Sequence, residues 1–331
     1  MNKLPVGVVG VGRLGTLHAK MFSLAEGAEL VGVADMDQSR ASTVAAEFNC
    51  KPFPSVEELF RHVKAISIAT STRAHHEIAK KALNAGIHLF IEKPVTTTVA
   101  EARELVALAK KNNCKIQVGH IERFNPALLA LEKYHIAPMF IESHRLAQFN
   151  PRGTDVNVVL DLMIHDIDII MSLVRSTVGE IQANGISVVS DSIDIANARL
   201  QFENGCVANV TASRISQKKM RKMRMFQKDA YISVDFSDGL AEVFRLVDSD
   251  DPQAKSTMML GEIEAGSHKR KIVYEQPEIK EVNALKHELE LFIDAVQNDK
   301  EPIVTGEEGM KALEVAQRII ETIQRQQHFK F

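Results

Sequence analysis

Residues 4–15 read LPVGVVGVGRLG, an apolar run followed by three glycines in the spacing GxGxxG. The run predicts a buried strand, Val6 to Val9, and the residues after it have the periodicity of a helix. Gly10 permits the tight turn, Gly12 lets backbone amides approach a pyrophosphate at the helix N-terminus, and Gly15 allows close packing of helix on strand. The stretch therefore predicts the start of a dinucleotide-binding domain.

A carboxylate follows at the distance that such a domain requires. Asp35 stands at the end of the next predicted strand, twenty residues beyond Gly15, where it can hold the ribose hydroxyls of adenosine. Repulsion between this carboxylate and a 2′-phosphate, about 1–4 kcal/mol at surface-like dielectric constants, favours NAD over NADP. Arg40 leaves NADP open, because it either covers the adenine, pairs with that phosphate, or is a solvated residue of the next helix.

The order of elements predicts two domains. Strand-like runs alternate with helical periodicity as far as residue 120, which predicts βαβ units and a doubly wound parallel sheet in an N-terminal Rossmann domain, residues 1–121. After residue 138 longer alternating strands predominate, so residues 122–331 are expected to form an α+β domain with an open-faced, largely antiparallel sheet. A helix at 158–174 interrupts these strands, Glu203-Asn204-Gly205 supplies a hairpin turn, and two helices close the chain.

Composition excludes several classes of function. The 331 residues carry 40 Lys and Arg against 43 Asp and Glu, and this balance lacks the basic surplus of a nucleic-acid-binding protein. Charged residues interrupt every apolar run before the roughly 20 residues that a membrane helix needs. The first ten residues lack the pattern of a secretory signal, so we expect a cytoplasmic protein. Three widely spaced cysteines suggest neither a disulfide framework nor a zinc site.

Four motifs make the chain resemble the Gfo/Idh/MocA (glucose-fructose oxidoreductase and inositol dehydrogenase) family over essentially its whole length. They are Gly10 to Gly15 with His18, Ala69 to Thr72 with His75, Glu92-Lys93-Pro94, and Asp161 to His165. The resemblance implies a Rossmann domain followed by an α/β domain whose sheet often forms the oligomer interface. It also implies nicotinamide-dependent oxidation of a sugar or cyclitol alcohol, with a homodimer or homotetramer as the expected assembly.

The resemblance further implies which residues contact the cofactor. Thr70, Ser71 and His75 would line it near its phosphates and ribose, and Glu92 would reach the nicotinamide half. Thr70 and Ser71 could instead simply turn the chain, and His75 could cap a helix. With the fingerprint, the expected cofactor-binding residues are Gly10, Gly12, Arg13, Leu14, Gly15, Asp35, Arg40, Thr70, Ser71, His75, Glu92, Lys93 and Arg123.

Three residues are candidates for the chemistry of alcohol oxidation, which needs a base for the hydroxyl proton. Asp161 and His165 are four apart on a predicted helix and hence share a face. Histidine exchanges protons near neutral pH, so His165 is expected to be the main acid/base residue, oriented by Asp161. Lys93, after the fifth strand, would polarise the reacting oxygen or relay its proton. No metal is expected, because this chemistry requires no Lewis acid.

Two features of the sequence bear on the substrate: one departure from the family pattern and one further resemblance. Met163 stands where the family's DxGxH pattern usually has Gly, and we expect it to narrow the substrate side of the cleft. The segments 120–126, 149–156 and 161–168 resemble the branch of UDP-N-acetylglucosamine 3-dehydrogenases, which favours a nucleotide-linked amino sugar, oxidised at its 3-hydroxyl, over a free sugar or inositol. The expected substrate-binding residues are Lys93, His120, Asn125, Arg152, Asp161 and His165.

A diphosphate-bearing substrate requires cations that balance its negative charge. Arg123, Arg152 and the cluster Lys218 to Arg224 are the candidate cations. The exposed face of the second-domain sheet is expected to be apolar and buried against another copy.

Fold alone does not decide function. The rival interpretation is therefore a sugar-sensing regulatory protein that keeps the fold without turnover.

Overall fold

The computed structural model describes residues 3–150, 156–248, 258–265 and 268–326. The chain divides into two compact units. The first contains residues 1–124 and 283–314, and the second contains residues 125–282 and 315–331. The first junction lies three residues beyond the predicted boundary at 121, and a C-terminal segment that we had assigned to the second domain returns to the first unit.

The first unit is built on a six-stranded sheet whose paired strands are all parallel. Its order is β3-β2-β1-β4-β5-β6, in which the direction of winding reverses between β1 and β4. Doubly wound sheets bind ligands at this reversal, outside the carboxyl ends of the strands. The strands are β1 Leu4–Val9, β2 Ala28–Ala34, β3 Lys51–Phe53, β4 Ala65–Ile68, β5 His88–Glu92 and β6 Ile116–Gly119.

Helices connect these strands, and most begin at a residue that caps them. Thr98 and Glu101 form a reciprocal capping box at the start of α5, and the Asp37 carboxylate accepts the first amides of α2. The helices are α1 Arg13–Leu24, α2 Gln38–Glu47, α3 Val56–Phe60, α4 Thr72–Asn84 and α5 Val99–Lys111, with a 3-10 turn at Ile121–Phe124. The predicted alternation of strand and helix is therefore confirmed.

Helix α8, Ala284–Gln297, completes the core of the first unit. Its apolar stripe, which includes Leu289, Phe292 and Ile293, is buried in the same cluster as Val6, Val8 and Phe22. The helix itself is predicted by its 3.6-residue periodicity, but periodicity says only that one face is buried and not which element covers it.

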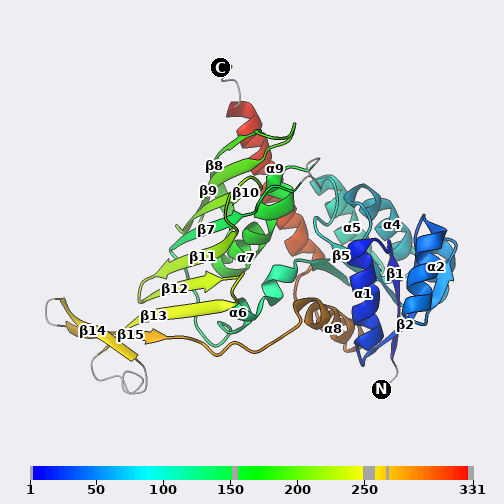
Figure 1. The fold of residues 1–331 in the computed structure, drawn as a ribbon, viewed down its shortest axis with the longest axis horizontal. Helices are drawn as coiled ribbons and strands as arrows, with labels where there is room; N and C mark the ends of the chain where they lie inside the picture. The colour runs from blue at the N-terminus through cyan, green and yellow to red at the C-terminus, as the bar shows by residue number, and fades with distance from the viewer. Residues whose placement is uncertain (1–2, 151–155, 249–257, 266–267, 327–331) are drawn as a thin grey trace. The chain divides into compact units, whose positions relative to one another are not determined.

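The second unit contains a nine-stranded mixed sheet in the order β14-β15-β13-β12-β11-β7-β10-β9-β8 (Figure 1). Within this second sheet, the pairing of β7 with β10 is the only parallel one among the described strands, so the predicted, largely antiparallel sheet is confirmed. Gly205, at a φ of 87°, makes the predicted hairpin turn between β9 and β10. The strands are β7 Phe140–Leu146, β8 Val178–Ile186, β9 Ile195–Phe202, β10 Val207–Ser213, β11 Met220–Gln227, β12 Ala230–Asp235, β13 Leu240–Asp248, β14 Met258–Ala265 and β15 His268–Glu275.

Alternation along these strands separates two faces of the sheet. In β7, Ile141, Ser143 and Arg145 are buried while the residues between them are partly exposed. Short helix α6, Pro126–Leu129, contacts β12 and β13, and α7, Ile164–Val174, contacts β7 and β10. The long helix α9, Gly306–Gln326, supplies Ile323 against Gly185.

The opposite face of the sheet is not the uniformly apolar surface that we expected. A hollow on it is lined by polar side chains from β7 to β10, namely Glu142, His144, Gln182, Asn184, Asn197, Arg199, Asn209 and Thr211. Beside it runs a stripe of aromatic rings at centroid distances of 4.9–5.8 Å, formed by Phe140, Phe226, Tyr231, Phe244 and Tyr274. The aromatic stripe fits the expected apolar face, but on β8 to β10 the expectation is wrong, because their outward positions carry amides and charges.

The predicted helix at 158–174 has two kinds of winding. Residues Val159–Met163 form a π-helical turn, and regular α-helix follows in α7. Such turns occur frequently at functional sites.

None of the described helices is long and apolar enough to cross a membrane. The three cysteines are free, and burial raises the pKa of the Cys50 thiol to about 11.

Candidate cofactor and active-site residues

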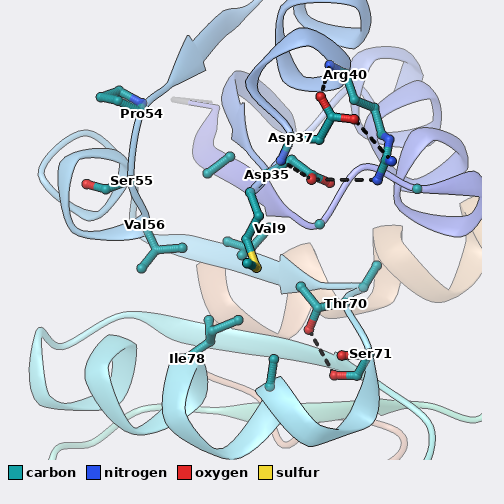
Figure 2. Close-up of a pocket in the computed structure, with 16 residues that line it drawn as sticks. Val9, Asp35, Asp37, Arg40, Pro54, Ser55, Val56, Thr70, Ser71 and Ile78 are labelled. Carbon is teal, nitrogen blue, oxygen red and sulfur yellow. Dashed lines mark hydrogen bonds and ion pairs between the residues drawn. The ribbon is translucent and has the colours of Figure 1, made fainter.

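A cavity of about 550 Å³ lies at the carboxyl ends of the first unit's strands. Its lining comes from the ends of β1, β2 and β4 and the loops that follow them, from Pro54 to Val56 after β3, and from α4 residues such as Ile78 (Figure 2). One wall is apolar, with Val9, Met36, Val56 and Ile78, and the other carries the glycine loop and polar side chains. This combination suits adenosine, which has a flat apolar ring and a hydroxylated ribose.

The glycine loop has the geometry that the fingerprint requires. Gly10 has a φ of 82°, and a Cβ atom there would lie 2.5 Å from Thr70 Cγ2. A Cβ atom on Gly15 would lie 1.8 Å from the Gly10 carbonyl oxygen, so only glycine lets α1 approach β1 this closely. A Cβ on Gly12, by contrast, would meet nothing within 4 Å, which leaves open space in front of the N-terminus of α1. Arg13 and Leu14 begin that helix.

Asp35 is fixed by the backbone at the rim of the cavity. Its Oδ2 accepts a hydrogen bond from the amide of Val11 at 2.8 Å, and its Oδ1 accepts one from the amide of Asp37 at 2.9 Å. Ionised carboxylates have about four acceptor positions, so two remain for ribose hydroxyls. The Arg40 guanidinium lies 3.6 Å from Asp35 and 3.3 Å from Asp37. Figure 2 shows Arg40 drawn toward these two carboxylates.

Two of the three residues expected near the phosphates line the cavity, and the third supports it. Thr70 and Ser71 belong to the lining, with the Thr70 hydroxyl donating to the Ser71 carbonyl at 3.3 Å. His75 is only 1% exposed, and its ring nitrogens lie 3.1 Å from the Pro94 carbonyl and 3.2 Å from that of Thr70. Burial lowers the pKa of His75. His75 thus joins the loop after β4 to the loop after β5 and lies beneath the cavity.

Glu92 and Lys93 stand at the carboxyl end of β5. A Glu92 oxygen accepts from the backbone amide of Lys93 at 3.2 Å, and the carboxylate packs so closely over Gly119 that a Cβ atom there would lie 2.8 Å from it. On its other side the carboxylate lies 3.1 Å from Nε2 of His18, a buried residue of α1. Lys93 is partly exposed, which leaves it accessible at the strand ends where ligands bind.

The residues after β6 make more structural contacts than we expected. His120 is almost fully buried at the end of the strand. The Arg123 guanidinium pairs with Glu308 at 2.9 Å. In the second unit, the Asn125 side chain caps α6 through the Ala127 amide and donates to the Phe236 carbonyl at 3.1 Å. These contacts position the backbone, and a cofactor or substrate role for the three residues stays a prediction.

The helix that carries Asp161 and His165 is anchored inside the second unit. Both residues are partly exposed, whereas their neighbour Asp166 is buried and forms a two-pronged ion pair with Arg145 at 2.8 and 3.1 Å. Such a paired geometry holds both partners firmly. Met163 has an exposed fraction of 0%, so its side chain packs in the core of this unit. Our expectation that Met163 narrows an open cleft is therefore wrong.

Asp194 holds the loop that adjoins the start of the same helix. Its carboxylate accepts hydrogen bonds from the amides of Val188, Val189 and Ser190 at 2.7–3.0 Å and from the Ser190 hydroxyl at 2.7 Å. Burial by itself would raise the pKa of Asp194, but these donors lower it to about 2. The Ile193 amide donates to the side-chain oxygen of Asn157, and the Ile193 carbonyl accepts from the Val158 amide, so the loop supports the π-helical turn.

Three further expectations concern charged groups. Arg152 lies outside the described residues. Of the basic cluster Lys218 to Arg224, the part from Met220 onward belongs to strand β11, and two of its cations are paired, Lys222 with Asp235 at 3.0 Å and Arg224 with Glu142 at 2.7 Å. These two cations are therefore poor candidates for a phosphate site, and a role for the rest of the cluster stays a prediction. Among the described residues, no three His, Cys, Asp or Glu side chains gather in an arrangement that would hold a metal.

Sequence reasoning missed parts of this site. The contribution of Pro54 and Val56 to the cavity was not predicted, because a short strand and a short helix place them there. Ile78, on the longer helix α4, was also not assigned to the site. The contact of His18 with Glu92 was also missed. The spacing of Gly15, His18, Ala19 and Phe22 on one helix face would have indicated that His18 is buried.

Comparisons with known proteins agree with the architecture. Residues 4–120 match the Gfo/Idh/MocA model described as an oxidoreductase family, NAD-binding Rossmann fold, and residues 145–331 match that family's C-terminal alpha/beta domain. The chain is 40% identical over 245 residues to the UDP-N-acetylglucosamine 3-dehydrogenase of Acidithiobacillus ferrooxidans, covering 74% of this chain and 78% of the relative. A solved structure of that enzyme has a TM-score of 0.88 with 34% identity, over 98% of this chain and 99% of that chain.

More distant relatives share the fold. The myo-inositol 2-dehydrogenase of Thermotoga maritima is 26% identical over 326 residues, covering 93% of this chain and 92% of the relative. The structure of a scyllo-inositol dehydrogenase from Lactobacillus casei superposes with a TM-score of 0.77 at 18% identity, over 98% of each chain.

Proposed function

The chain belongs to the Gfo/Idh/MocA oxidoreductase family, and from this membership and its cofactor site we propose that it is an NAD-dependent dehydrogenase of a nucleotide-linked amino sugar. The hydroxyl oxidised is that on carbon 3. The observation that carries the substrate class is the 40% identity to a UDP-N-acetylglucosamine 3-dehydrogenase. Because both the cofactor and such a substrate are nucleotides of the cell interior, we place the enzyme in the cytoplasm.

The choice of NAD rests on the residues around Asp35. Its two oxygens are held by the amides of Val11 and Asp37 and so keep a fixed direction toward the ribose position. A 2′-phosphate would be repelled by this carboxylate. The Arg40 guanidinium, which could otherwise compensate, already faces two carboxylates. NAD, with free ribose hydroxyls, is therefore the cofactor that these residues favour.

The residues fit the group that the family binds. The open space before Gly12 and the free amides of the first turn of α1 suit a pyrophosphate. The apolar wall with Val56 and Ile78 suits an adenine ring. When bound, NAD supplies the acceptor for the hydride that leaves the sugar carbon.

Three side chains of the protein are assigned to removal of the proton from the substrate hydroxyl. Oxidation of the alcohol removes a hydride from carbon 3 and a proton from its hydroxyl, which leaves a ketone. We assign His165 as the group that accepts this proton, with Asp161 orienting its ring and the Lys93 ammonium polarising the oxygen. The buried Arg145–Asp166 pair supports the assignment, because it fixes the helix next to His165.

A substrate panel tests the proposal. The protein is incubated with NAD or NADP and with UDP-N-acetylglucosamine, glucose or myo-inositol, while hydroxylamine traps the ketone and NADH absorbance is followed. We expect reduction of NAD with the sugar nucleotide. Turnover of inositol or glucose alone would instead assign the chain to the activity of its more distant relatives, and binding of sugars without turnover in any combination would favour the sensor.

A further inference from the structure

A buried chain of three side chains joins helix α1 to the carboxyl end of β5. His18 is 0% exposed, its Nδ1 lies 2.7 Å from the hydroxyl of Ser67 on β4, and its Nε2 lies 3.1 Å from a Glu92 oxygen. The imidazole ring is also held edge-on against Phe90, with ring centroids 5.4 Å apart. Three secondary-structure elements, α1, β4 and β5, thus determine the orientation of one histidine.

The contacts decide which ring nitrogen carries the proton. A bare Nε2 lone pair facing a carboxylate oxygen at 3.1 Å would be repelled by it, so Nε2 carries a hydrogen whenever Glu92 is ionised. The Ser67 hydroxyl can then donate to Nδ1 of the neutral ring. Among the described residues Nε2 makes no hydrogen bond of good geometry, so its 3.1 Å approach to the Glu92 carboxylate is a close polar contact and not an aligned hydrogen bond.

Glu92 stands at the carboxyl end of β5, across the reversal of winding from Asp35, where the second half of a bound dinucleotide would extend. One of its oxygens faces His18 and the other accepts the Lys93 amide, while Gly119 lies beneath the carboxylate. The side chain is 11% exposed, so the carboxylate borders the crevice at the strand ends. The N-terminus of α1, which offers its amides to the pyrophosphate, belongs to the same helix as His18.

We propose that His18 is a positioning residue that keeps the Glu92 carboxylate oriented toward the nicotinamide ring. The inference rests on the proposed function, because it needs a nicotinamide cofactor. The oxidised ring carries a positive charge and the reduced ring does not. A carboxylate beside it therefore stabilises the oxidised form more than the reduced form, and His18 controls the ratio of the two affinities.

Two variants of His18 separate this role from packing. In His18→Gln the side-chain amide reaches about as far as Nε2 and can still donate to Glu92, whereas in His18→Asn it reaches only as far as Nδ1 and Ser67. We expect His18→Asn to raise the Kd of NAD about tenfold more than the Kd of NADH, and to lower kcat by roughly 10- to 100-fold. His18→Gln should restore most of the wild-type affinity ratio.

Two further variants complete the test. Ser67→Ala removes the contact on the other ring nitrogen and should lower the melting temperature while leaving the affinity ratio within about twofold of wild type. Glu92→Gln removes the charge at constant shape, and adding His18→Asn to it should change the ratio no further, because both changes remove the same interaction.

Kd values for NAD and NADH are measured by titration without any sugar, together with melting temperatures. Equal effects of His18→Asn and His18→Gln on the ratio, or additive effects of His18→Asn and Glu92→Gln, would overturn the proposal. If the wild-type protein bound neither form of the cofactor, the proposed function itself would fail first, so the two failures are distinguishable.

Discussion

Replacing Asp35 by Asn should reverse much of the preference between the two cofactors. The carboxylate contributes two separable effects, charge-assisted hydrogen bonds to the ribose hydroxyls of NAD and repulsion of the 2′-phosphate of NADP. Both its oxygens are fixed by backbone amides at 2.8 and 2.9 Å, so the side chain cannot swing away to relieve the repulsion. Asn removes the charge and keeps the shape.

The size of the change follows from these two effects. A charge-assisted hydrogen bond contributes about 1.5–3 kcal/mol, so kcat/KM with NAD should fall by at least tenfold. Relief of the repulsion adds about 1–4 kcal/mol in favour of NADP, and Arg40 then loses one of its two carboxylate neighbours. Because about 1.4 kcal/mol corresponds to a factor of ten, the ratio of kcat/KM values should shift toward NADP by roughly 100-fold.

Asp37→Asn is the matched control for this measurement. Asp37 also faces Arg40, but it caps α2 through one oxygen that Asn retains. We expect the cofactor ratio of this variant to stay close to that of wild type. Steady-state kinetics with both cofactors give the answer. An equal loss of kcat/KM with NAD and NADP in Asp35→Asn, or a preference of the wild-type protein for NADP, would contradict the role of Asp35 in selecting NAD.

Four further outcomes are expected. Lys93→Ala and His165→Ala should each lower kcat by at least about 100-fold with little change in the Kd of NAD, and wild-type turnover in either would remove that residue from the mechanism. Gly15→Ala should abolish cofactor binding in a titration, since its Cβ would lie 1.8 Å from the Gly10 oxygen; unchanged affinity would contradict the role of that glycine. Asp194→Asn should lower unfolding free energy at neutral pH by about 1–3 kcal/mol. Because the folded-state pKa of Asp194 is lowered to about 2, its stabilisation is complete above about pH 4 and fades as the pH falls toward 2, so urea unfolding of wild type and variant should converge there; a constant difference would exclude the carboxylate as its source. Light scattering at micromolar concentration should give a dimer or tetramer, and a monomer would contradict the expected assembly.

The sequence predicted the first sheet well because its strands and helices carry different periods. Val6 to Val9 and the glycines after them lie as expected, and the pattern repeats along the unit. Strand β3, Lys51–Phe53, and helix α3, Val56–Phe60, were missed because three and five residues are too few to show a period. Pro54 and Val56, which these two short elements place, line the cavity.

Long-range packing was beyond the reach of periodicity. The amphipathic pattern of α8 predicts a helix with one buried face, yet its place beside α1 depends on residues almost 300 positions away in the sequence. The burial of Met163 was also not predicted. Met163 lies in the π-helical turn that precedes α7, where side chains are displaced from regular α-helical positions. The sequence motif singles out Asp161 and His165 but does not predict which residues surround them.

Transfer of a labelled hydride from carbon 3 of the sugar tests the proposed reaction. UDP-N-acetylglucosamine carrying deuterium on carbon 3 is incubated with the protein and NAD, and the reduced cofactor is analysed by mass spectrometry. We expect the reduced cofactor to gain one deuterium, and Lys93→Ala to form almost none of it. Reduced cofactor without deuterium would show that a different carbon is oxidised, and no reduced cofactor would contradict the proposed activity.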